Sequence, residues 1–241
     1  MSWHVTREGA VAVIAVDRPP DNLTSFTLLR ELDELLEAIG NDENTTVVVI
    51  TAAQPGLFVG RADREDLDKV GRGEIDRDEF ANWLWTLRRI ETIPQPVVAA
   101  IDGPAWGGGC ELSLACTLRI GSSRAEFCQM EILRGAIPGA GASQRLPRLI
   151  GASRAAEMIL TGRPVGAQEA KDIGLLNVLV DASDFRTAAL EWASEFARPR
   201  RPALVAAKRA LNEGRELPLL DGLMHEQHLF LDVFSDLVKE P

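Results

Sequence analysis

The sequence predicts an α/β fold with a helical C-terminal part. Short apolar runs typical of buried strands alternate with helical segments through the first three quarters of the chain. From about residue 185 the pattern is helical throughout, over 185–197, 202–212 and 217–238. The 241 residues are enough to bury one substantial core. We therefore expect a core over residues 1–184 and a helical region over residues 185–241.

The first predicted elements lie between residues 11 and 51. Residues 11–16 form a strand that ends at the turn residues 17–20. A helix follows, with Thr24 or Ser25 as its N-cap and with leucines repeating along one face. The continuous apolar run 47–51 is typical of a strand covered on both faces.

The middle of the chain begins with a charged segment. Residues 64–79 are rich in charge and contain two glycines, so we expect a mobile loop there. A helix is predicted at 80–90, followed by a buried strand at 96–101.

A triple-glycine turn at 107–109 follows this strand and leads into a short predicted helix. Glycines let the backbone approach a ligand closely, and a helix N-terminus favours negative charge. Glu111 lies beside this turn, and Glu131 opens a second glycine-rich segment. A carboxylate next to an anion-stabilising turn indicates proton transfer beside a developing oxyanion. Taken singly, the glycines also fit plain strand–helix packing, and Glu131 fits a solvated carboxylate.

Taken together, these segments resemble the enoyl-CoA hydratase/isomerase (crotonase) superfamily. The match includes residues 99–112, through the glycine turn to Glu111, and residues 127–147 around Glu131. The resemblance extends over about residues 5–220. It implies a crotonase-like spiral of ββα repeats, with the helical region 185–241 mediating assembly into a homotrimer or homohexamer.

The resemblance also implies the parts of an active site. Glu111 and Glu131 correspond to the two catalytic glutamates of the family. Residues 58–63 resemble the first oxyanion turn, so the N–H groups of Ala62 and Gly108 would hold the thioester oxygen.

Further positions are expected to contact the substrate. Gly139 would offer its N–H to the reacting water, and Asp63 and Trp106 belong to the matched turns. Arg61 stands where the family normally has glycine, and Glu65 occupies a position often held by a lysine that contacts coenzyme A. Arg61 or Arg64 could supply the missing cation, although both also fit solvated surface charges.

The sequence ends soon after Phe234, where relatives commonly continue into one more helix that completes the acyl pocket or a neighbour's coenzyme A site. We therefore expect part of the grip on coenzyme A to be missing.

The implied reaction adds water across the 2,3 double bond of a 2-enoyl-CoA and gives a 3-hydroxyacyl-CoA. It needs neither a metal nor a redox cofactor, because coenzyme A is part of the substrate. A double-bond isomerase or another CoA-thioester lyase is an alternative, but isomerases generally need one carboxylate. A non-catalytic acyl-CoA-binding protein is a second alternative, which Arg61, Glu65 and the chain's end favour and the two glutamates disfavour.

Composition narrows the class of protein. The net charge of −10 argues against a nucleic-acid partner. No apolar run has the length of a membrane span, and the first residues lack the apolar core of a signal peptide. The odd number of cysteines, three, indicates a reducing compartment, so we expect a cytoplasmic protein whose cysteines are small buried residues. The spacing of the three histidines indicates no metal site.

Overall fold

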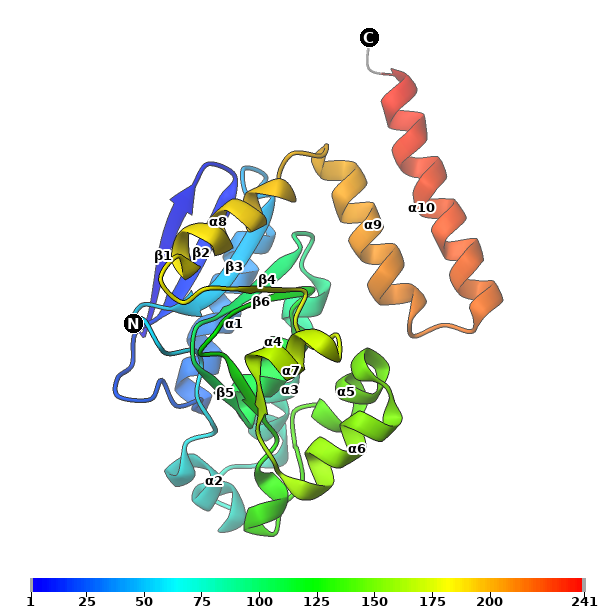
Figure 1. Cartoon of the computed structure of the whole chain (residues 1–241). Coiled ribbons are helices and arrows are strands. Elements are labelled where there is room, and N and C mark those ends of the chain that lie inside the picture. Colours follow the sequence, from blue (N-terminus) through cyan, green and yellow to red (C-terminus); the bar gives the residue numbers. More distant parts are fainter. Residues whose placement is uncertain (1, 240–241) are drawn as a thin grey trace.

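The computed structural model describes residues 2–239 and contains two β-sheets surrounded by helices (Figure 1). The larger sheet has six strands in the order β1-β2-β3-β4-β6-β9, and the smaller has the order β5-β7-β8. The large-sheet strands are β1 (Trp3–Glu8), β2 (Val11–Val16), β3 (Val47–Ala52), β4 (Val97–Ile101), β6 (Leu118–Ser122) and β9 (Val178–Val180). The small-sheet strands are β5 (Pro104–Trp106), β7 (Glu126–Cys128) and β8 (Val165–Gly166).

From β4 to β7, successive strands alternate between the two sheets. β4 passes through a two-residue turn into β5, and β6 passes through a short turn into β7. Within the large sheet only the β1–β2 pair is antiparallel, and the other pairs are parallel. This alternation confirms the predicted α/β class and its repeated ββα units.

The helices cover the faces of the sheets and form the C-terminal part. They are α1 (Phe26–Gly40), α2 (Arg64–Gly71), α3 (Arg77–Thr92), α4 (Gly108–Ala115), α5 (Ala142–Ile150), α6 (Ala152–Thr161), α7 (Ala167–Asp172), α8 (Phe185–Glu195), α9 (Arg201–Gly214) and α10 (Leu219–Lys239), with a 3-10 helix, η1 (Glu131–Arg134). α1 begins as predicted, because the Ser25 hydroxyl accepts a hydrogen bond from the Leu28 N–H at 3.1 Å.

The core occupies both faces of the large sheet. Leucines of α1 and residues of α3 pack against one face, whereas Phe185, Ala189 and Ala193 of α8 are buried against the other. Strand β3 is therefore covered on both sides, as its continuous apolar run predicts.

The charged segment 64–79 is more ordered than the sequence suggests. Residues 64–71 form α2, and Lys69 lies 3.1 Å from Glu65 one turn earlier. Oppositely charged side chains at this spacing stabilise a largely solvated helix in which no residue is fully buried. The predicted loop is reduced to the residues between α2 and α3.

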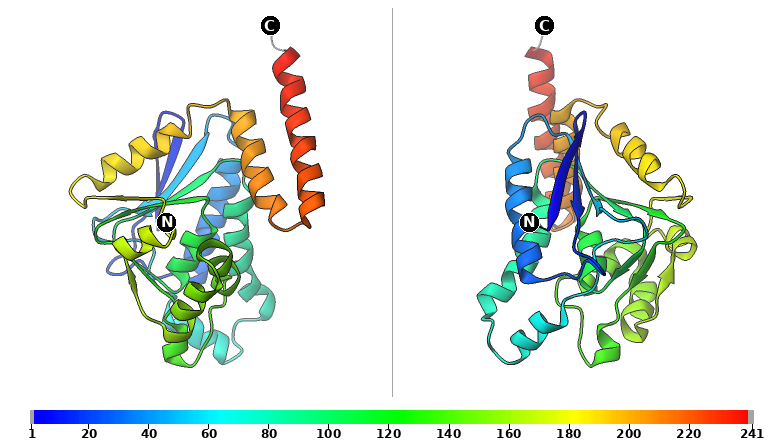
Figure 2. Two further views of the ribbon diagram at one scale, coloured as in Figure 1. Left: turned by 45° about the vertical axis from the view of Figure 1, so that its right-hand side comes forward. Right: turned by 90° about the vertical axis from the view of Figure 1, so that its left-hand side faces the viewer.

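The C-terminal hairpin of α9 and α10 extends away from the sheets (Figures 1 and 2). Its anchor is Lys208, which is 4% exposed and donates hydrogen bonds to the carbonyls of Ile90, Ile93 and Gln95 at 3.2, 2.7 and 2.8 Å. These carbonyls lie at and just after the end of α3, where helical partners are lacking. α10 packs chiefly on α9. No helix within residues 2–239 has the length and apolarity needed to span a membrane.

Replacing Lys208 with methionine should destabilise the protein. The variant keeps the aliphatic length but leaves three buried carbonyls without donors, so the free energy of unfolding should fall by about 1–3 kcal/mol. Urea unfolding followed by circular dichroism measures this change. Arg209→Met, which removes an exposed ion pair with Glu213 on the same helix, is the control and should cost less than about 1 kcal/mol. Equal losses in both variants would contradict the anchoring role.

Candidate active site

The glycine turn at the start of α4 is tied to the smaller sheet. Gly107 bends the chain with a φ of +51°, and its N–H donates to the Cys128 carbonyl of β7 at 2.8 Å. Gly108 is the first residue of α4, so its N–H has no acceptor within the helix. The N–H of Gly108, the donor predicted from the sequence, therefore has no acceptor within its own helix and lies at a helix N-terminus, where negative charge is favoured.

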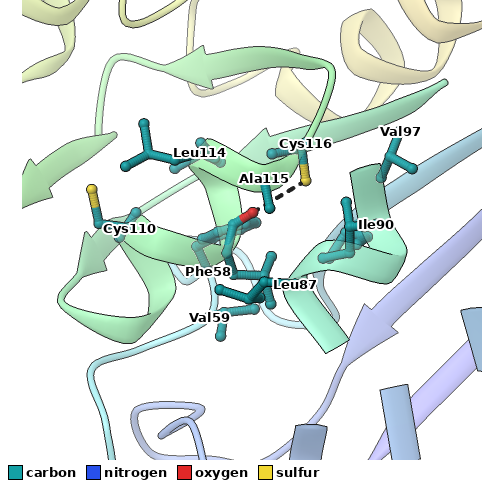
Figure 3. Packing of buried hydrophobic residues seen from close by; sticks show 14 of the residues in the cluster. Phe58, Val59, Leu87, Ile90, Val97, Cys110, Leu114, Ala115 and Cys116 are labelled. Carbon is teal, nitrogen blue, oxygen red and sulfur yellow. Dashed lines mark hydrogen bonds between the residues drawn. The ribbon is translucent and has the colours of Figure 1, made fainter. Parts of the chain in front are cut away.

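The second predicted oxyanion turn packs directly against the first. A Cβ added at Gly109 would overlap the carbonyl oxygen of Val59. Phe58 and Val59 are buried beside α4 together with Leu87 of α3 (Figure 3). The two turns, far apart in the sequence, are thus held in backbone contact.

Ala62 lies in a short parallel bridge with Thr24. The bridge consists of the Thr24 N–H to the Arg61 carbonyl, 2.9 Å, and the Asp63 N–H to the Thr24 carbonyl, 2.7 Å. Neither bond uses the N–H of Ala62. The structure therefore brings the Ala62 and Gly108 segments together and leaves both N–H groups outside the hydrogen bonds that hold the turns.

Arg61 does not require the conformational freedom of the glycine it replaces. Asn22 is the one residue other than glycine with a positive φ within residues 2–239, so Arg61 has an ordinary backbone. Its Cα and Cβ lie 3.9 and 3.8 Å from the position of a Cβ added at Gly107. Arg61 is therefore next to the glycine turn, whereas Arg64 is exposed on α2, 3.7 Å from Asp68.

The other predicted contact residues have structural partners. Asp63 caps α2 by accepting from the Glu65 N–H at 3.0 Å. Trp106 donates its indole N–H to Glu126 at 3.0 Å. Gly139 lies beside α3, since a Cβ added there would be 3.4 Å from Phe80.

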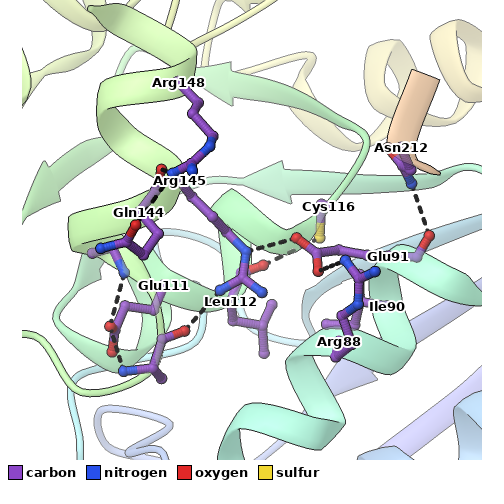
Figure 4. Close-up of polar contacts among 12 residues, drawn as sticks. Arg88, Ile90, Glu91, Glu111, Leu112, Cys116, Gln144, Arg145, Arg148 and Asn212 are labelled. Atoms are coloured by element: carbon purple, nitrogen blue, oxygen red, sulfur yellow. Dashed lines mark hydrogen bonds and ion pairs between the residues drawn. The ribbon is translucent and has the colours of Figure 1, made fainter. Parts of the chain in front are cut away.

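Glu111 is the buried carboxylate of the site. It is 3% exposed, and its Oε1 accepts from the N–H groups of Ala140 at 2.7 Å and Ala142 at 3.2 Å (Figure 4). Burial, together with the charge of Glu131, raises the pKa of Glu111 to about 7, against the opposing effect of the two N–H groups. Glu111 can therefore accept or release a proton near neutral pH.

Glu131 faces the glycine turn from η1. Its Oε1 lies 2.9 Å from the position of a Cβ added at Gly107, and its Oε2 is buried with no partner among the described residues. Burial raises the pKa of Glu131 above its ordinary value. Both predicted glutamates are thus brought to the same turn, and burial raises the pKa of each.

Sequence reasoning missed the groups that hold Glu111. The donors are the backbone N–H groups of Ala140 and Ala142. The identity of a residue does not predict which ligand its backbone N–H binds, although the neighbouring glycines indicate a close approach of the backbone. The cysteine prediction is confirmed, because Cys110, Cys116 and Cys128 are free and buried.

Comparisons with known proteins identify the family of the chain. A family model described as Enoyl-CoA hydratase/isomerase matches residues 6–240. The chain belongs to this family. It is 35% identical to a short-chain-enoyl-CoA hydratase of Clostridium acetobutylicum over 95% of this chain and 88% of that protein. It is 34% identical to a mitochondrial methylglutaconyl-CoA hydratase of Mus musculus over 96% of this chain and 76% of that protein.

Solved structures give the same result for the fold. The crystal structure of enoyl-CoA hydratase from Bacillus anthracis superimposes with a TM-score of 0.90 at 36% identity, covering 98% of this chain and 92% of that chain. The predicted resemblance to the crotonase superfamily and the predicted spiral fold are both confirmed.

Replacing Gly109 with alanine should disturb both turns of the site. The new methyl group would overlap the Val59 carbonyl, and the strain should lower the free energy of unfolding by about 1–3 kcal/mol or more. Chemical denaturation measures the loss. Gly166→Ala is the matched control, because a Cβ there meets nothing within 4 Å and its φ is −75°. A Gly109 variant as stable as this control would contradict the close contact of the two turns.

Proposed function

We propose that the protein is an enoyl-CoA hydratase that converts a 2-enoyl-CoA thioester to the 3-hydroxyacyl-CoA. The observation that supports this most directly is the pair of carboxylates at one glycine turn, Glu111 buried and Glu131 half-buried, each with a raised pKa. Hydration has to remove a proton from water and deliver a proton to Cα, so it uses two such groups.

In the proposed reaction Glu111 takes a proton from water while the hydroxide forms its bond to Cβ. Electrons of the double bond move toward the thioester carbonyl, and the N–H groups of Ala62 and Gly108 stabilise the oxygen that becomes negative. Glu131 then delivers a proton to Cα, which completes the addition of one water molecule. The N–H of Gly139 is assigned to the same water.

The substrate's phosphates need a local basic surface on this acidic protein. Arg61 beside the glycine turn and Arg64 on α2 are the proposed cations. Asp63 and Trp106 are proposed to line the substrate path. The three free cysteines support a reducing compartment, for which we propose the cytoplasm.

The decisive experiment mixes purified protein with crotonyl-CoA and follows loss of the conjugated-thioester absorbance. Glu111→Gln and Glu131→Gln should each lower kcat by about 10²- to 10⁴-fold, the contribution of one general acid or base. Glu195→Gln, on α8, is the control and should keep the wild-type rate.

Two outcomes would favour other functions. Tight binding of crotonyl-CoA and of longer or branched enoyl thioesters in a calorimeter, without turnover of any of them, would favour an acyl-CoA-binding protein. Formation of a positional isomer without a 3-hydroxy product would favour an isomerase.

We also propose that the chain forms a homotrimer or homohexamer through its helical region 185–241. Large apolar side chains are exposed on the hairpin of α9 and α10, including Leu219 at 80% and Phe230 at 61%. A surface of this kind is typical of a subunit interface. α10 projects beyond the body of the protein, where a second subunit can reach it (Figure 2).

Light scattering after gel filtration tests this assembly. The wild type should show three or six times the chain mass of 26.3 kDa, because an interface would bury the apolar hairpin. Phe230→Asp should shift the protein toward monomer, since a charge in an apolar interface is costly to desolvate. Glu226→Gln, on the same helix, should leave the mass unchanged. A monomeric wild type would contradict the proposed assembly.

A further inference from the structure

Arg145 connects the loop of residues 139–142, whose N–H groups bind Glu111, to the end of α3. It lies on α5 with its side chain 15% exposed, and its Nε donates to Glu91 Oε1 at 2.7 Å. Its Nη1 donates to the carbonyl oxygen of Ala140, also at 2.7 Å (Figure 4). A charge-assisted pair with little exposure to water keeps a well-defined geometry.

Both backbone polar groups of Ala140, its N–H and its carbonyl oxygen, form hydrogen bonds. Its carbonyl accepts from Arg145, and its N–H donates to Glu111. The guanidinium also fills the space beside Gly141, where an added Cβ would overlap Nη1. Arg145 therefore lies against the backbone whose N–H groups bind Glu111, and a shift of its side chain would release that backbone.

We propose that Arg145, held in place by Glu91, is a positioning residue that fixes the loop 139–142 so that its N–H groups bind the carboxylate of Glu111. This inference rests on the proposed function, in which Glu111 is the base. Arg145 influences Glu111 in two ways, by holding the backbone of Ala140 and by the effect of its positive charge on the carboxyl group.

The charges around Glu111 come from three directions. Glu131 of η1 raises the pKa of Glu111, and Arg145 of α5 lowers it. Behind Arg145, on α3, Glu91 pairs with both Arg145 and Arg88. Strand β5, which also packs on α4, carries no charged side chain.

Two substitutions should therefore move the titration of Glu111 in opposite directions. Arg145→Met removes the cation and loosens the loop, so the pKa of Glu111 should rise. Glu91→Gln keeps a hydrogen-bond acceptor for Arg145 but removes the negative charge that offsets it, so the pKa of Glu111 should fall. A role confined to structural stability would not produce shifts of opposite sign.

The first measurement follows the carboxyl carbons of ¹³C-labelled glutamate by NMR as the pH is varied. The Glu111 signal is assigned by its loss in Glu111→Gln, and no substrate is needed. Relative to the wild type, the midpoint should move up in Arg145→Met and down in Glu91→Gln, each by up to about one pH unit. Arg148→Met, an exposed arginine on the same helix bonded to Gln144, is the control and should leave it unchanged.

The second measurement is the pH profile of crotonyl-CoA hydration. The base must be ionised, so activity falls as the pH drops through the pKa of Glu111. In Arg145→Met this acid limb should move to higher pH, with kcat about 10- to 100-fold lower and KM nearly constant, because the loop is misplaced and Arg145 lies behind Ala140. Arg145→Lys keeps the positive charge, so its acid limb should lie between those of Arg145→Met and the wild type.

The outcomes separate this inference from the proposed function. An inactive wild type whose Glu111 titration still shifts as described would overturn the hydratase function and keep the positioning role of Arg145. An unchanged Glu111 titration in both Arg145→Met and Glu91→Gln would overturn the inference, whatever the activity. Shifts in the same direction in both variants would also overturn it, because they would indicate general loosening.

Discussion

The contact of two backbone turns is the constraint on which the rest of the structure depends. Gly109 at the start of α4 meets the carbonyl of Val59 with no room for a side chain between them. Apolar packing by Phe58 and by α3 holds this contact in the core (Figure 3). The contact sets where the N–H groups of Ala62 and Gly108 lie, and the same glycine turn meets the carboxylate of Glu131.

Burial of Glu111 follows from this arrangement. The turns and the loop 139–142 exclude water from Glu111, and exclusion of water raises the pKa of a carboxylate. Two backbone N–H groups donate to the carboxylate and partly offset this rise in pKa, so both the charged and the neutral form of Glu111 are accessible near neutral pH. The same burial that defines the core thus tunes the acid–base groups.

The end of α3 links the site to the C-terminal hairpin. The side chain of Glu91 pairs with Arg145 next to the Glu111 loop, and its backbone carbonyl accepts from Asn212 of α9 at 2.8 Å. Lys208, also on α9, donates to the neighbouring carbonyl oxygens of Ile90 and Ile93. Residues widely separated in the sequence therefore meet at one helix terminus, where free carbonyls require donors.

The sequence by itself determined the α/β class, the leucine face and serine cap of α1, the doubly covered strand β3 and the two glutamates beside glycine turns. These features are encoded in local spacing and residue type. Tertiary structure alone decided which backbone N–H groups bind Glu111, how Arg145 and Glu91 reach that loop, and that the charged residues 64–71 form a helix. Backbone donors carry no residue-type signal, and a partly buried ion pair between α3 and α5 depends on how distant segments pack.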